Sequence, residues 1–87
     1  MYRIVLSKEA AKHYQKVDKH TRKRLDGALD TIAIDPFDVQ HHDIKPLHKP
    51  LKGLWRYRVG KFRIVYRVDK NSEQIQIVTI RSRGEVY

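Results

Sequence analysis

The spacing of apolar positions changes about halfway along this chain. In the first half they recur every three or four residues, as on one face of a helix: Leu25, Ala28, Leu29, Ile32 and Ala33. From residue 54 onward, apolar and polar positions alternate instead, which is the period of a half-buried strand. The pattern predicts helices first and a sheet after them.

Turn and cap residues divide this pattern into elements. Ser7 and Asp18 are good helix N-caps, and Asp35-Pro36 ends the second helix because the residue before a proline avoids helical angles. We expect a strand at 2–6, helices at 8–17 and between 18 and 35, and strands at 54–59, 62–68 and 74–81. The loop at 37–50 is expected to hold a short extended piece around 42–45. The order β-α-α-β-β-β predicts one α+β domain over residues 1–87, with a helical hairpin packed on one face of a small antiparallel sheet.

Strand alternation sorts the side chains of the second half onto two faces. One face is aromatic and aliphatic and is suited to pack on the helices: Trp55, Tyr57, Val59, Phe62, Ile64, Tyr66 and Val68. The other carries guanidinium groups: Arg56, Arg58, Arg63 and Arg67. Like charges on adjacent strands repel one another, so the pattern favours an anion bound across them. The alternative is an ordinary solvent face whose arginines pair with Glu73 or Glu85.

The net charge indicates that the anion bound by these arginines is a polyanion. The chain has 19 Lys and Arg against 10 Asp and Glu, a net charge of +9 and a pI near 10.0. Residues 1–44 carry 8 basic and 7 acidic side chains, whereas residues 45–87 carry 11 and 3. This imbalance indicates nucleic acid as the first partner class. A membrane surface is less favoured, because no basic stretch is strongly amphipathic.

The cysteine, histidine and apolar content of the chain excludes several kinds of site and location. Without cysteine, disulfides, thiolate nucleophiles and cysteine metal sites are excluded. The His41-His42 pair has no third ligand at a suitable spacing, so we expect neither a metal nor a cofactor. The first apolar run is too short for a signal peptide and no run reaches eighteen residues, which predicts a cytoplasmic protein without membrane contact.

Three segments resemble the RelE/ParE superfamily of type II toxins: Leu51-x-Gly53, the run WRYRVGKFRIVY at 55–66, and the ending IRSRGEVY at 80–87. The Arg-x-Arg-x-x-Val-Tyr ending is the most specific of these and favours the RelE branch over the ParE branch. The resemblance covers nearly the whole chain and implies the β-α-α-β-β-β fold. It also implies a toxin that a cognate antitoxin protein holds inactive.

RelE-type toxins are metal-independent endoribonucleases that cleave mRNA in the ribosomal A site. A ribose 2′-hydroxyl attacks the adjacent phosphate and the 5′-oxygen leaves. By position, the resemblance assigns catalytic roles to Arg56, Arg58, Arg63, Arg81 and Tyr87. Further RNA-binding residues are predicted to be His48, Lys52, Lys61, Arg67 and Arg83. Guanidinium groups suit this reaction because its transition state gains negative charge, and a tyrosine ring can stack on a splayed base.

One departure from the family pattern affects the mechanism. The first-strand basic residues are often lysines in this family, and a lysine there is the proposed general base, whereas arginine is a poor base. The proton would then go to His48, Lys52, Lys61 or Tyr87, or the site would work without a dedicated base. Two other functions stay open: a ParE-like inhibitor of DNA gyrase, and a superfamily member that binds nucleic acid without cutting it.

Overall fold

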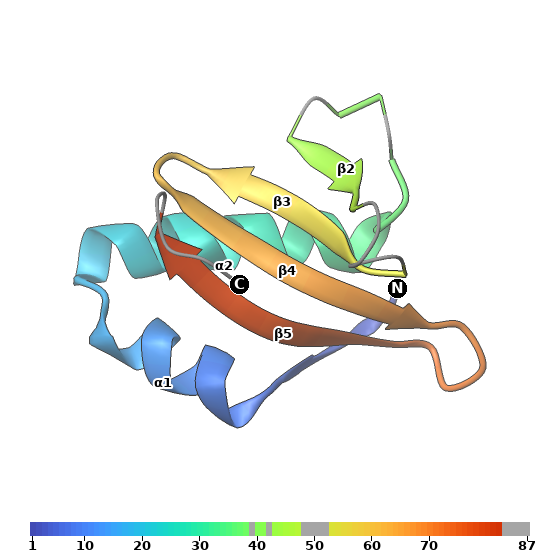
Figure 1. The fold of residues 1–87 in the computed structure, drawn as a ribbon, viewed down its shortest axis with the longest axis horizontal. Coiled ribbons are helices and arrows are strands. Elements are labelled where there is room, and N and C mark those ends of the chain that lie inside the picture. The colour runs from blue at the N-terminus through green and yellow to red at the C-terminus, as the bar shows by residue number, and fades with distance from the viewer. Residues whose placement is uncertain (39, 42, 48–52, 83–87) are drawn as a thin grey trace.

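A computed structural model describes residues 1–38, 40–41, 43–47 and 53–82 of the chain (Figure 1). Its elements, in chain order, are β1 (Arg3–Leu6), α1 (Lys8–Lys16), α2 (Lys19–Ile34), β2 (Ile44–Pro46), β3 (Trp55–Val59), β4 (Phe62–Asp69) and β5 (Gln74–Ser82). The predicted α+β class and element order are confirmed. The extended piece expected in the loop is present as β2, displaced slightly toward the C-terminus.

The strands form one sheet in the order β1-β5-β4-β3-β2. The pairs β2–β3, β3–β4 and β4–β5 are antiparallel, as expected, but β1 joins β5 in parallel and makes the sheet mixed. The end of β1 is fixed beside the middle of β5 by Ser7. Its amide donates to the carbonyl of Ile77 at 2.9 Å and its hydroxyl donates to the carbonyl of Val78 at 2.7 Å.

Both helices begin at the predicted caps. The hydroxyl of Ser7 accepts from the amide of Ala10 at 3.0 Å, and the carboxylate of Asp18 accepts from the amide of Thr21 at 3.0 Å. The bond from Thr21 lowers the pKa of the Asp18 carboxyl below its usual value. Helix α2 ends at Ile34, directly before the Asp35-Pro36 pair. No helix in the described part of the chain is long and apolar enough to cross a membrane.

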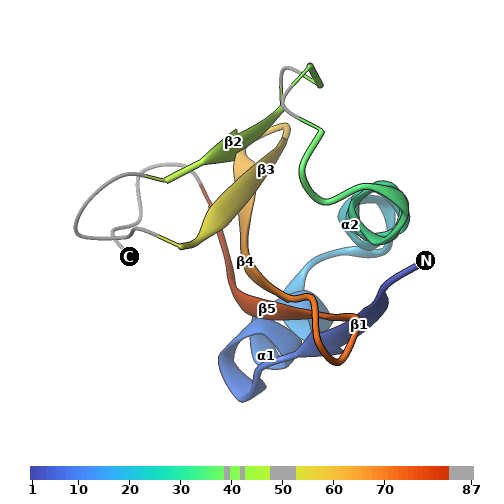
Figure 2. The same cartoon turned by 90° about the vertical axis from the view of Figure 1, so that its right-hand side faces the viewer.

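The core lies between the curved sheet and the two helices (Figure 2). Its buried members are Ala10 of α1, three residues of α2 and six of the strands: Leu25, Ala28, Ile32, Val59, Ile64, Tyr66, Ile75, Ile77 and Ile80. Trp55, Tyr57 and Phe62 are partly buried against this cluster. The predicted inward face of β3 and β4 is therefore confirmed. Burying it leaves the alternate residues of both strands on the opposite face.

Tyr66 provides a test of this packing. It is fully buried, and its hydroxyl donates to the carbonyl of Pro36 at 2.7 Å, which ties β4 to the end of α2. We expect Tyr66→Phe to lower the free energy of unfolding by about 1–2 kcal/mol, because the buried carbonyl loses its donor. Urea denaturation at pH 7 measures this, with Tyr2→Phe as the control. An unchanged free energy in the Tyr66 variant would contradict it.

The buried phenol of Tyr66 also leads us to expect that the free energy of unfolding depends on pH in the alkaline range. Burial raises the pKa of Tyr66 far above its ordinary value. The native state thus keeps a proton that the unfolded chain loses near pH ~10, so this group makes stability fall as the pH rises above that value. We expect the alkaline loss of stability to be shallower in Tyr66→Phe than in the wild type. Parallel curves of unfolding free energy between pH 9 and 11 would rule this out.

Candidate nucleic-acid interface

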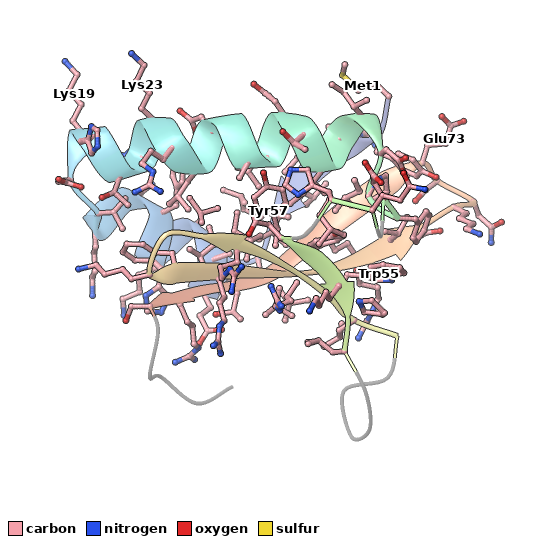
Figure 3. The ribbon with its side chains drawn as sticks, turned by 90° about the horizontal axis from the view of Figure 1, so that it is seen from above. Met1, Lys19, Lys23, Trp55, Tyr57 and Glu73 are labelled. Carbon is pink, nitrogen blue, oxygen red and sulfur yellow. The ribbon has the colours of Figure 1, made fainter. Side chains whose placement is uncertain are left out.

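Strand register aligns three arginines across the sheet. Arg58 of β3 is the direct partner of Arg63 of β4, and Arg63 is in turn the partner of Arg81 of β5. We call Arg58, Arg63 and Arg81 the arginine row. Tyr57, the neighbour of Arg58, lies between the sheet and α2 (Figure 3), so the row occupies the opposite face. Directly paired positions have Cβ atoms about 4.5–5.5 Å apart, which places three guanidinium stems side by side.

The place of Arg81 in this row depends on an irregularity in the β4–β5 register. Thr79 pairs with Val65, but the next residue of β4, Tyr66, pairs with Ile77, so Val78 is an extra residue. Such a bulge shifts the alternation of the strand that contains it. Ile75 and Ile77 therefore face the core before the bulge, and Arg81 faces away from it after the bulge.

A second line of residues runs beside the row on the same face. Arg56 pairs with Val65, which pairs with Thr79, and on its other side Arg56 pairs with Lys45 of β2. Val65 and Thr79 are buried, with 1% and 3% of their surfaces exposed. No described residue bonds to the Thr79 hydroxyl. The cations of this face thus lie beside two side chains that are almost completely buried.

Two carboxylates from outside the central strands contact the row. The Nε of Arg58 donates to Oδ1 of Asp43 at 3.3 Å, and Nη2 of Arg81 pairs with Oε1 of Glu9 at the start of α1. Among the described residues, the Arg63 side chain has no hydrogen-bond or ion-pair partner. The sequence left open that these arginines pair with Glu73. The structure shows no such pair with Arg63, because Glu73 lies in the β4–β5 turn, at the other end of β4.

A hollow of about 130 Å³ opens beside the row at the β3–β4 turn. It is lined by Arg58, Gly60, Lys61, Phe62 and Arg63. Gly60 has a φ of 56°, in the left-handed region that favours glycine. Because a water molecule occupies about 30 Å³ of liquid, the hollow has room for one phosphate group. Arg58 and Arg63 reach it from two strands, so it could hold an anion between two guanidinium groups.

The remaining predicted residues are placed as follows. Arg67 is exposed and pairs with Gln76 on the far side of Val65 from the row. Lys61 lies in the turn, with its ammonium 5.8 Å from the centre of the Phe62 ring. His48, Lys52, Arg83 and Tyr87 lie outside the described residues. Over the described ranges, no cluster of three His, Asp or Glu side chains could hold a metal ion.

Three residues of this surface were not predicted from the sequence. Lys45 could have been found only by predicting β2 and its register against β3. Asp43 and Glu9 reach the row from 15 and 72 residues away along the chain, and no local pattern marks such contacts.

The chain is similar to known toxins over almost its full length. Residues 4–87 match a family model described as the ParE toxin of the type II toxin–antitoxin system parDE. A Mycobacterium tuberculosis protein named toxin RelE is 26% identical, over 99% of this chain and 86% of that protein. The archaeal RelE in its RelE–RelB complex from Pyrococcus horikoshii is 26% identical, with a TM-score of 0.79 over 98% of both chains. The YoeB/ParE toxin from Agrobacterium tumefaciens is 20% identical, with a TM-score of 0.81 over 93% of this chain and 98% of that one.

Repulsion within the row predicts a gain in stability when its middle charge is removed. We expect Arg63→Gln to raise the free energy of unfolding by about 0.5–1 kcal/mol at low salt. The gain should fade in 0.5 M salt, which screens the charges. Thermal and urea unfolding measure both effects. Lys23→Gln is the control, because Lys23 points away from the sheet on α2 (Figure 3). A loss of stability at low salt would show that the middle arginine is not under repulsion.

Proposed function

Because the chain belongs to the ParE toxin family of type II toxin–antitoxin systems, we propose that it is a toxin that inhibits translation by cleaving mRNA on the ribosome. The observation that carries this proposal is the arginine row, with Arg56 beside it and the phosphate-sized hollow at its end. Mutual repulsion destabilises such a row in the free protein, and a bound phosphate relieves it. Similarity to RelE proteins, in sequence and in fold, supports this choice within the superfamily.

The proposed reaction needs no metal. A ribose 2′-hydroxyl attacks the adjacent phosphorus, the bond to the 5′-oxygen breaks, and the products are a cyclic phosphate and a 5′-hydroxyl end. Negative charge builds on the phosphoryl oxygens in the transition state, where fixed guanidinium donors stabilise it more than the ground state. The arginines of the row meet this requirement, with Arg56 beside them. Tyr87 is proposed to stack on a base, as the family resemblance implies.

Proton transfer requires a group other than these arginines, which stay protonated. Lys61 and Lys45 are the described amines beside the site, and His48, Lys52 and Tyr87 remain sequence-based alternatives. A reaction that relies on charge stabilisation alone is also compatible with this set of residues. It would be slow, because general base catalysis typically contributes about 10²–10⁴-fold.

We also propose that a cognate antitoxin covers this surface in the cytoplasm. The Pyrococcus relative was solved as a complex of RelE with RelB, and the basic half of this chain suits an acidic partner segment. An amphipathic helix or an added strand would provide the contact.

A second function, inhibition of DNA gyrase, is favoured by one observation: the matching family model is described as a ParE toxin. The two functions separate in a paired assay of mRNA cleavage on programmed ribosomes and of DNA supercoiling by gyrase. We expect cleavage and no effect on supercoiling. Inhibited gyrase with intact mRNA would overturn the proposed function.

Arg81 gives the sharpest test of the chemistry. We expect Arg81→Ala to slow mRNA cleavage by about 10²–10³-fold, by analogy with the loss of other oxyanion donors. Ribosome binding should change little, because a transition-state contact affects rate more than ground-state affinity. Primer extension measures the cleavage and co-sedimentation measures the binding, with Lys23→Ala as the control. Equal losses in both would make Arg81 a simple phosphate anchor.

A further inference from the structure

Asp43 contacts both arginines of β3 from the position directly before β2. Its main-chain carbonyl accepts from the amide of Arg58 at 3.0 Å and from Nη1 of Arg56 at 3.2 Å. Its carboxylate accepts from Nε of Arg58 at 3.3 Å. One residue therefore holds the backbone of Arg58 and the side chains of both arginines.

Asp43 is itself fixed by its neighbours. Its amide donates to Nδ1 of His41 at 3.2 Å, and the carbonyl of His41 accepts from the amide of Ile44 at 2.9 Å. The ring centres of His41 and Tyr57 lie 5.2 Å apart, and Tyr57 is partly buried against the core. The Asp43 side chain is only 23% exposed. This carboxylate is therefore not a freely moving surface group.

The bond from Nε determines what Arg58 can offer to a ligand. Within the described part of the chain, no residue accepts from its terminal Nη1 or Nη2, and the side chain is 51% exposed. A guanidinium held at Nε keeps both terminal groups for a second acceptor. Arg58 is one of the residues that line the phosphate-sized hollow. The Asp43 carboxylate also places a negative charge next to Arg58, which lines that hollow, and this charge opposes the binding of an anion there.

We propose that Asp43 is a positioning residue for the arginine face: it orients Arg58 and Arg56 toward the reacting phosphate and weakens ground-state binding of RNA. The inference rests on the proposed endoribonuclease function. Orientation matters because a displacement of about 1 Å at a reacting group can cost 10²-fold in rate. Orientation of the arginines raises the rate of cleavage, whereas repulsion between the carboxylate and RNA lowers the affinity before the reaction. The two effects can therefore be measured separately, as a rate and as a binding constant.

Two substitutions of Asp43 distinguish its charge from its geometry. Asp43→Asn removes the charge but keeps an oxygen that can accept from Nε of Arg58, whereas Asp43→Ala removes both. Binding is measured by fluorescence anisotropy with a short RNA oligonucleotide whose 2′-hydroxyls are all methylated, so that it lacks the nucleophile. Cleavage is measured in single turnovers on programmed ribosomes. Both variants should bind the oligonucleotide about 3- to 10-fold more tightly at low salt, from the loss of one nearby negative charge.

Cleavage should separate the two variants. We expect Asp43→Asn to stay within about 3-fold of the wild type and Asp43→Ala to fall by about 10- to 100-fold. Asp30→Asn and Asp30→Ala are the matched controls, because Asp30 is exposed on α2 and makes the same change in net charge. An Ala variant that cleaves at the wild-type rate or faster would overturn the proposal. Weaker binding of the oligonucleotide by both variants would also overturn it. So would a loss of cleavage in both the Asn and the Ala variant that runs parallel to a loss of thermal stability.

A spectroscopic measurement keeps the inference testable if the wild type does not cleave mRNA. Solvent exchange of the Arg58 Nε proton, followed by ¹⁵N NMR, should be slow in the wild type and in Asp43→Asn and fast in Asp43→Ala. Equal exchange in all three would show that the carboxylate does not orient Arg58. Failure of the wild type to cleave, with the expected exchange pattern, would instead overturn the proposed function and leave the positioning role of Asp43 intact.

Discussion

The alignment of like charges across three strands is the constraint on which the rest of this structure depends. A sheet turns alternate residues to opposite faces, so burial of Val59 and Ile64 against the helices turns their neighbours Arg58 and Arg63 to the other face. Register then sets Arg81 of β5 directly beside Arg63, so three guanidinium stems lie side by side. The hydrophobic core holds the row together against its own repulsion. A protein selected for stability alone would not favour three adjacent arginines there.

The two carboxylates that contact the row offset the repulsion between its arginines only in part. Glu9 and Asp43 contact the arginines at the two ends of the row, whereas the side chain of the middle residue, Arg63, has no ion-pair or hydrogen-bond partner among the described residues. Glu9 belongs to the first turn of α1 and Asp43 precedes β2, so segments far apart in the chain meet at one sheet face. An anion that binds over the middle of the row meets guanidinium groups already held from both sides. This arrangement limits the reorganisation that binding requires, which is the condition for electrostatic catalysis.

Regular elements could be predicted from the sequence, and long-range contacts could not. The caps at Ser7 and Asp18, the end of α2 and the faces of β3 and β4 follow from local preferences and a fixed period, and the structure has them as predicted. The parallel direction of β1 was not predicted, because it depends on where β1 meets β5 rather than on residues within β1. The contacts of Asp43 and Glu9 have the same origin. The roles of the arginines in RNA cleavage remain predictions, as does the role of Tyr87.

Strand β5 shows why alternation alone is insufficient at this site. Ile75, Ile77 and Arg81 all occupy odd positions, so an unbroken strand would turn the guanidinium of Arg81 to the same face as two core isoleucines. Burying an unpaired charge there would cost far more than one isoleucine side chain contributes. The extra residue, Val78, resolves this conflict by shifting the alternation once between Ile77 and Arg81. In the sequence the bulge is marked only by two adjacent apolar residues, Ile77 and Val78, where a regular strand would have one apolar and one polar residue. The third cation of the row therefore reaches the open face because of a backbone irregularity, and that irregularity lies within the proposed site.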